Sequence, residues 1–207
     1  DERIAILANI GKSEKIIPSY MDFVDIAGLV KGASKGEGLG NKFLGHIREV
    51  DAIAHVVRCF KDENIIHVSN QIDPIRDIET INTELQLADI ETLQNRELSL
   101  QKKVKGGDKI IQSELKIIEK ILNSIEHNNS LKFDDFNENE INFVKSLNLI
   151  TFKPILYICN VDEGSVELGN DYSKTVIEFS SKNNHKCVLV SASIESQIAA
   201  LDDLNEK

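Results

Sequence analysis

Residues 153–192, KPILYICNVDEGSVELGNDYSKTVIEFSSKNNHKCVLVSA, carry the clearest pattern of secondary structure in the chain. It begins and ends with short apolar runs, KPILYICN and KCVLV, and between them residues 172–184 have helical spacing. Continuous apolar runs are typical of parallel strands that are covered on both faces. The order strand, helix, strand therefore predicts part of a parallel sheet with helices packed against it.

The same alternation extends to both sides of this stretch. Upstream, AIAHVVRCF (52–60) predicts another strand, and the spacing of Phe43, Leu44 and Ile47 predicts a helix before it. Downstream, residues 194–201 have helical spacing. Near the start, ERIAILANIG (2–11) predicts a helix that stops at Gly11, and SYMDFVDIAG predicts a strand ending near Asp25. Together these elements predict an α/β fold with a mostly parallel sheet and helices on both faces.

Residues 78–149 differ from this pattern. Apolar residues recur at three- and four-residue intervals on either side of Lys105-Gly106-Gly107-Asp108, which predicts two helices joined by a tight turn. The pair is too long for an ordinary crossover helix. We therefore expect an inserted antiparallel helical domain over 78–149, between two parts of the α/β domain at 1–77 and 150–207.

Composition narrows the class of protein. The chain has 34 acidic and 24 basic residues, a net charge of −10, so it is a poor candidate for binding nucleic acid over its whole surface. No apolar run is long enough to span a membrane, and the first residues given do not have the basic-then-apolar pattern of a signal peptide. Cys59, Cys159 and Cys187 all lie in apolar runs, and we expect buried, reduced thiols and a cytoplasmic protein.

Asp25-Ile26-Ala27-Gly28 is the first motif with chemical content. A carboxylate after a strand can hold the outer shell of Mg²⁺, and a glycine three residues later lets its N–H approach a phosphate. A glycine-rich loop follows, typical of a nucleotide-dependent switch. In contrast, Gly11-Lys12-Ser13 is not expected to be a phosphate-binding P-loop, because Ile6 replaces the required glycine and the triplet ends a helix.

Two further loops follow the strands of the opening stretch. Asn160-Val161-Asp162-Glu163 occupies the place where GTPases carry NKxD, with Val161 at the lysine position and Glu163 at the aspartate position. Ser191-Ala192 fits the short motif that lies behind the base. In an open α/β sheet, ligands bind beyond the carboxyl ends of the strands, where these loops emerge.

The chain resembles the YchF/Obg-like ATPase family over nearly its whole length. The resemblance rests on DFVDIAGLVKGASKGEGLGNKFLGHIREVDAIAHVVRCF (22–60), NIIHV (64–68), INTELQLAD (81–89), KGGDK (105–109) and NVDE (160–163). It implies a Ras-like P-loop NTPase domain with an inserted coiled-coil hairpin, ATP hydrolysis often preferred over GTP hydrolysis, Mg²⁺ as cofactor, and association with ribosomes. It also implies a longer protein, in which the P-loop and the first switch precede Asp1 and a TGS domain follows Lys207.

The resemblance assigns roles residue by residue. Asp25 resembles the ligand of a Mg²⁺-bound water, and His67 matches the histidine proposed to orient the attacking water, because Leu29 cannot do so by hydrogen bonding. The residues that resemble nucleotide contacts are Gly28, Asn160, Val161, Glu163, Ser191 and Ala192. The switch loop contains Leu29, Gly32, Gly36, Gly38 and Gly40.

Three functions remain open. The leading one is an ATPase that signals to the translation machinery; the alternatives are a GTP-preferring enzyme and a non-catalytic scaffold that docks on ribosomes. Without a P-loop, we expect these 207 residues alone to bind ATP weakly and not to hydrolyse it. Two basic clusters could contact ribosomal RNA or form ordinary solvated surface. They are Lys31, Lys35, Lys42 and Arg48, and Lys102, Lys103, Lys105 and Lys109.

Overall fold

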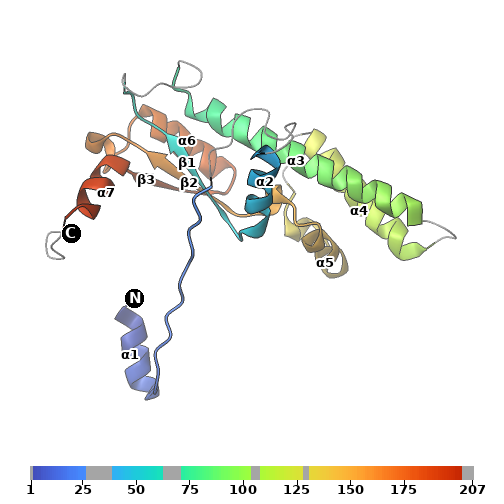
Figure 1. Ribbon diagram of the computed structural model, residues 1–207, viewed down its shortest axis with the longest axis horizontal. Coiled ribbons are helices and arrows are strands. Elements are labelled where there is room, and N and C mark those ends of the chain that lie inside the picture. Colours follow the sequence, from blue (N-terminus) through green and yellow to red (C-terminus); the bar gives the residue numbers. More distant parts are fainter. Residues whose placement is uncertain (1, 27–38, 63–70, 104–107, 128–130, 202–207) are drawn as a thin grey trace.

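A parallel sheet forms the centre of the computed structural model, which describes residues 2–26, 39–62, 71–103, 108–127 and 131–201 (Figure 1). The described strands lie in the order β1 (Ile53–Arg58), β2 (Ile155–Asn160) and β3 (Lys186–Val190). Both pairings are parallel, and Cys159 of β2 is in register with Val57 and Leu189. The predicted parallel sheet is confirmed, and the three apolar runs provide its strands. All three carboxyl ends therefore lie along one edge.

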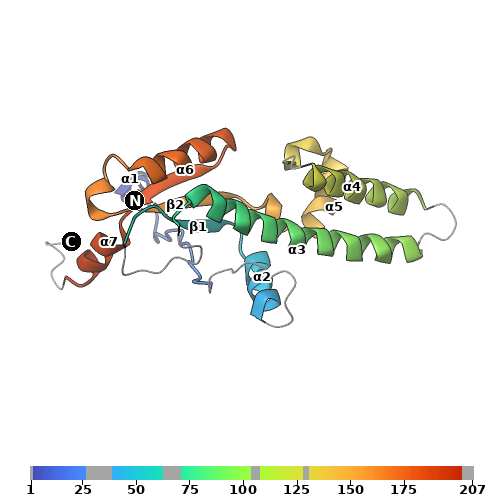
Figure 2. The ribbon, with the colours of Figure 1, turned by 90° about the horizontal axis from the view of Figure 1, so that it is seen from above.

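Two helices cover one face of this sheet. Helix α3 (Pro74–Lys103) packs against β1, and α6 (Asp171–Lys182) packs against β2 and β3 (Figure 2). On the opposite face Val56 and Val188 are 62% and 42% exposed, so the expectation of helices on both faces holds for only one face within the described residues. The covered face forms a core of Val57, Cys59, Ile78, Tyr157, Cys159, Val161 and Val176.

A second core lies away from the sheet, where α3 and α4 (Lys109–Glu126) run side by side (Figures 1 and 2). Asp108 caps α4 by accepting a hydrogen bond from the N–H of Ile110 at 2.9 Å, which fixes where the helix begins. Helix α5 (Glu138–Ser146) packs on α4. The buried side chains of this second core are Leu93, Leu100, Ile117, Ile118, Ile121, Phe136, Val144, Leu147 and Leu149.

Helix α2 (Leu39–Glu49) packs on the middle of α3. Leu44 and Ile47 are buried against Leu85, Ala88 and Ile150. Helix α3 thus belongs to three cores in turn: its first turns pack on the sheet, its middle on α2, and its far half on α4. Within the described segments, this single helix connects the three hydrophobic cores.

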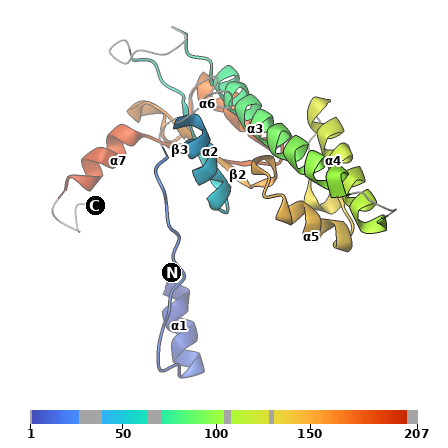
Figure 3. The ribbon, with the colours of Figure 1, turned by 45° about the vertical axis from the view of Figure 1, so that its right-hand side comes forward.

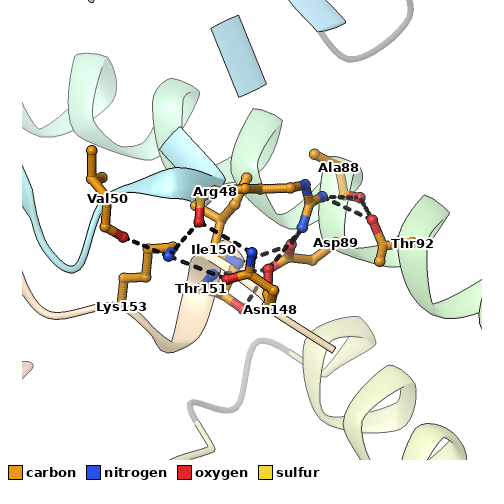
Figure 4. A network of polar contacts seen from close by, with 9 residues as sticks. All are labelled: Arg48, Val50, Ala88, Asp89, Thr92, Asn148, Ile150, Thr151 and Lys153. Atoms are coloured by element: carbon orange, nitrogen blue, oxygen red, sulfur yellow. Dashed lines mark hydrogen bonds and ion pairs between the residues drawn. The ribbon is translucent and has the colours of Figure 1, made fainter. Parts of the chain in front are cut away.

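A network of polar contacts joins the end of α2, the middle of α3 and residues 148–153 (Figure 4). The guanidinium of Arg48 contacts Asp89, and Asp89 also accepts hydrogen bonds from the N–H groups of Ile150 and Thr151 at 3.0 and 2.8 Å. Lys153 donates to the carbonyl oxygens of Arg48 and Val50 at 2.9 and 2.6 Å, where α2 ends. Our placement of Arg48 in a basic surface cluster was wrong, because its charge is already paired with a buried carboxylate.

The N-terminal part stands apart from the sheet. Helix α1 (Glu2–Gly11) forms as predicted and ends at Gly11, and Figures 1 and 3 show it separated from the other helices. The predicted strand ending near Asp25 is wrong: residues 15–26 have no strand, and Phe23 and Val24 are 79% and 62% exposed. A strand needs a backbone partner, and this segment pairs with none of the strands described.

Short elements complete the described chain. Helix α7 (Ala192–Ala199) follows β3 directly, and single 3₁₀ turns occur at η2 (Phe133–Asp135), η3 (Ile150–Phe152) and η4 (Glu163–Ser165). Within the described segments, no helix is both long enough and apolar enough to cross a membrane.

Candidate functional site

The carboxyl ends of β2 and β3 are tied together by one side chain. Asn160, the last residue of β2, accepts a hydrogen bond on its Oδ1 atom from the N–H of Ala192 at 3.0 Å. The backbone adds a second link, because the N–H of Val161 donates to the carbonyl oxygen of Val190 at 2.9 Å. The two loops that the sequence analysis singled out, 160–163 and 191–192, therefore meet at this edge of the sheet.

The end of β1 joins the same site through Asn170. Its Nδ2 atom donates to the carbonyl oxygen of Cys59 at 2.7 Å and to Oδ2 of Asp162 at 3.1 Å. The Asn170 Oδ1 atom accepts from the N–H of Ser173 at 3.0 Å, so the residue also caps α6. One asparagine thus fixes the relative positions of β1, the 160–163 loop and α6.

The carboxylate of Asp162 is ionised at neutral pH and held in place. The hydroxyl of Ser165 donates to it at 2.8 Å, and this hydrogen bond, helped by the one from Asn170, lowers the pKa of Asp162 from its ordinary value. Because its oxygens serve the loop itself, the structure gives Asp162 a role in shaping the loop.

Glu163 is held from the other side, by helix α7. Its Oε1 atom accepts hydrogen bonds from the Ser193 hydroxyl at 2.6 Å and from the Gln197 side-chain amide at 3.0 Å. All three side chains are exposed to solvent. The loop therefore offers a carboxylate held by two donors, three residues after the amide of Asn160, and these two groups are of the kind that form hydrogen bonds to the edge of a planar heterocycle.

Two of the predicted contact residues have structural tasks. The side chain of Val161 is only 2% exposed and packs in the core of the sheet. Ser191 is also buried at 2%, and its hydroxyl caps α7 by accepting from the N–H of Ile194 at 3.5 Å. Their side chains position the loops that carry Asn160 and Ala192.

Most of the residues predicted to act on the phosphates of the nucleotide lie outside the described part of the chain. This applies to Gly28, to His67 and to Leu29, Gly32, Gly36 and Gly38 of the switch loop, whereas Gly40 lies in the first turn of α2. Asp25 is described, and it lies in an exposed irregular segment. Among the described residues, no group of three or more His, Cys, Asp or Glu side chains could hold a metal ion. Asp25 fits a contact to Mg²⁺ through water, but it cannot hold the ion alone.

His55 of β1, Cys159 of β2 and Cys187 of β3 are uncharged at neutral pH. Burial lowers the pKa of His55 to about 4, so this histidine, whose ring centroid lies 5.5 Å from that of Tyr157, is neutral at pH 7. All three cysteines are free as predicted, and Cys59 and Cys159 are buried, but the prediction of burial is wrong for Cys187, which is only half-buried. The sulfur atoms of Cys159 and Cys187 lie 3.5 Å apart. A hydrogen bond to Cys59 and burial raise the pKa of Cys159, and burial raises that of Cys187 to about 11. These thiols are therefore protonated and unreactive.

Sequence reasoning missed four residues of this site: Asp162, Asn170, Ser193 and Gln197. Asn170 could have been found, because Asn-x-x-Ser before an apolar periodic segment is a helix N-cap pattern. Ser193 and Gln197 form part of a short polar helix, and nothing in their spacing points to Glu163, which lies 30 and 34 residues earlier in the sequence.

The comparisons with known proteins agree with this geometry. A family model described as 50S ribosome-binding GTPase matches residues 7–96. A ribosome-binding ATPase YchF from Pasteurella multocida is 51% identical over 203 residues, which are 98% of this chain and 56% of that protein. The YchF of Bacillus subtilis is 47% identical over 204 residues, again 98% of this chain and 56% of the relative.

A solved structure has the same fold. The YchF GTPase of Schizosaccharomyces pombe superposes with a TM-score of 0.81 at 33% identity, over 100% of this chain and 57% of that one. The chain thus spans little more than half the length of the relatives it matches. Agreement in sequence and fold leads to one assignment: the chain belongs to the YchF/Obg-like family of P-loop NTPases.

Proposed function

We propose that this chain forms the base-binding half of an ATP-hydrolysing enzyme that works on the ribosome. The observation that carries the proposal is the 3.0 Å hydrogen bond from the N–H of Ala192 to Asn160, which brings two base-recognition loops together at the strand ends. With its Oδ1 atom occupied, Asn160 retains its NH₂ group as a donor. Atom N7 of either purine can accept from that group, so Asn160 supports purine binding in general.

Glu163 is proposed to distinguish the two purines. Guanine offers two adjacent donors, N1–H and the 2-amino group, which a carboxylate with both oxygens available can receive. Glu163 has one more methylene than the aspartate of GTPases, and one of its oxygens already accepts two hydrogen bonds. We therefore expect ATP to bind at least as tightly as GTP, and Glu163→Asp to move the preference toward GTP.

Hydrolysis is proposed to depend on residues on the phosphate side. When bound, Mg²⁺ neutralises charge on the phosphates, and Asp25 would hold one of its waters. His67 is proposed to orient the attacking water, with Gly28 offering its N–H to the γ-phosphate and residues 29–40 acting as the switch. Leucine at position 29 cannot orient water by hydrogen bonding, which leaves that task to another residue.

A chimaera tests the enzymatic proposal. This chain would replace the matched 203 residues of the Pasteurella multocida relative. We expect Mg-dependent release of phosphate from ATP, and we expect His67→Ala to lower kcat about 100-fold or more while the Kd for nucleotide changes little. A chimaera that binds neither nucleotide, or a His67→Ala variant with unchanged kcat, would contradict the proposal.

A scaffold that docks on ribosomes is the second candidate function. The observation that favours it is that α3 and α4 run side by side away from the sheet (Figure 1). We propose that residues 78–149 are an inserted domain that contacts the ribosome, since Lys102 and Lys103 at the end of α3 and Lys109 at the start of α4 are exposed. Such a partner places the protein in the cytoplasm. Sedimentation with ribosomes separates the candidates: an enzyme should bind in a nucleotide-dependent way, and a scaffold should bind equally with and without ATP.

A further inference from the structure

Glu163 forms a three-residue cluster with two side chains of α7. Ser193 and Gln197 are four positions apart, one turn of the helix, so both side chains lie on the same face. Both donate to the same oxygen, Oε1 of Glu163, at 2.6 and 3.0 Å, and Gln197 Nε2 also lies 3.4 Å from the Ser193 hydroxyl. The second carboxylate oxygen, Oε2, has no partner among these contacts.

The backbone on both sides of this cluster is fixed. On the loop side, Val161 is tied to the end of β3, and Asp162 is tied to Ser165 and Asn170. On the helix side, α7 begins directly after β3, and its first residue, Ala192, donates to Asn160. These hydrogen bonds hold the backbone at both ends of the Glu163 contact, and the two donors on α7 set where the carboxylate lies.

We propose that Ser193 and Gln197 are positioning residues that set the nucleotide preference of the site. This inference rests on the proposed function, since it assumes that the base binds between Asn160 and Glu163. The two donors fill the lone pairs of Oε1 and leave only Oε2 for a ligand. Guanine then loses one of the two hydrogen bonds that its N1–H and 2-amino groups would make. Adenine, whose 6-amino group needs one acceptor, loses none.

The proposal predicts that removing the two donors relaxes the preference. In Ser193→Ala/Gln197→Ala both carboxylate oxygens become available, so GTP should bind more tightly while ATP affinity changes less than about threefold. We expect the ratio of the GTP Kd to the ATP Kd to fall about fivefold or more, as for the gain of one base-edge contact. Ser193→Thr keeps the hydroxyl and should keep the ratio of the unmodified chain.

Titration of the ¹⁵N-labelled 207-residue chain with Mg·ATP and Mg·GTP in the millimolar range measures this ratio. The reporters are the backbone amides of Asn160–Glu163 and Ser191–Ser193. The matched control is Ser196→Ala, an exposed serine on the same helix with no contact to Glu163. The spectrum itself shows whether each variant is folded, and since Ser193 and Gln197 are exposed we expect native spectra.

The possible results distinguish the role of Ser193 and Gln197 from the existence of the base site. Reporter amides that shift with nucleotide, but with a ratio that stays within twofold in Ser193→Ala/Gln197→Ala, would overturn the role of Ser193 and Gln197 and leave the base site standing. Reporter amides that shift with neither nucleotide in the unmodified chain would overturn the base site, and with it the proposed function. A ratio that falls equally in Ser196→Ala would also overturn the proposal, because the effect would then be general to α7.

Discussion

The Nη1 atom of Arg48 lies 3.2 Å from Oδ1 of Asp89, a carboxylate that is completely buried, while the arginine side chain is 22% exposed. The same guanidinium donates to the Thr92 hydroxyl at 2.8 Å and to the Asn148 carbonyl oxygen at 3.0 Å. This ion pair links the end of α2 to the middle of α3 and to the segment that leads into β2 (Figure 4). It is a polar contact between α2, which follows the predicted switch loop, and the long helix α3.

Arg48→Met should destabilise the fold by about 2–4 kcal/mol, because it leaves the buried carboxylate of Asp89 without a cation. The loss should stay moderate, since Asp89 keeps its hydrogen bonds from Ile150 and Thr151. Urea unfolding followed by circular dichroism measures the free energy, since the chain has no tryptophan. Lys116→Met, at an exposed position on α4, is the control and should cost less than about 0.5 kcal/mol. Equal effects of both substitutions would show that the ion pair contributes nothing.

Stability should fall on mild acidification because of His55. Its pKa in the folded chain is about 4, below the ordinary value of 6.5, so between these values the unfolded chain binds a proton that the folded chain does not. This contribution to stability is complete above pH 6.5 and is lost as the pH falls toward 4. From pH 7 to pH 5 we expect a loss of about 2 kcal/mol from this group.

His55→Gln removes the titrating group and tests this assignment. The variant should show a shallower decline in the free energy of unfolding between pH 7 and pH 5 than the unmodified chain. Part of the decline should remain, because burial also lowers the pKa of His185. If the free energy of unfolding depends on pH in the same way in both proteins, folding does not lower the pKa of His55.

The three cysteines should resist thiol reagents in the folded chain. A hydrogen bond to Cys59 and burial raise the pKa of Cys159, and burial raises that of Cys187 to about 11, so little thiolate of either residue exists at pH 8, while Cys59 is shielded by complete burial. A disulfide-exchange reagent at pH 8 should react slowly with native protein and rapidly with all three thiols in denaturant. Fast reaction of a cysteine in native protein, located by mass spectrometry, would contradict the burial or the raised pKa of that residue.

Gly169→Ala should destabilise the site edge. Gly169 has φ of +71°, and an added Cβ would lie 2.6 Å from the Ser173 hydroxyl oxygen. The strained backbone and the displaced Ser173 should together cost about 1–3 kcal/mol. Gly164→Ala is the matched control, because its Cβ would be in ordinary contact at 3.6 Å. Similar melting temperatures for the two variants would contradict this reading of the turn.

The sheet was predictable from sequence because its signals are local. Three apolar runs with intervening helical spacing specify parallel strands, and the loops at their ends are then brought to one edge by topology alone. The strand predicted within residues 18–25 was wrong because strand formation is not decided by local signals alone. Its apolar and β-branched residues match a strand, but a strand also needs a neighbouring backbone, and no pattern within the segment reveals whether one is available.

For the site, the sequence predicted which loops contribute but not which contacts their side chains make. Motif position located Asn160 and Glu163, but the motif does not show that Val161 packs into the core or that Gln197 contacts Glu163. Arg48 illustrates the same limit: beside nearby lysines in the sequence it resembles surface charge, whereas its partner Asp89 lies 41 residues away. Long-range polar pairs have no sequence period, so only the folded structure reveals them.

The most direct test of the central claim is to locate the bound base by photocrosslinking. The chain would be irradiated with 8-azido-ATP, with and without excess ATP, and the labelled peptide identified by mass spectrometry. We predict ATP-protected labelling within residues 160–163 or 191–197, and its loss in Asn160→Ala. Labelling confined to the segment around Gly11-Lys12-Ser13, or labelling that excess ATP does not suppress, would contradict a base site at the carboxyl ends of β2 and β3.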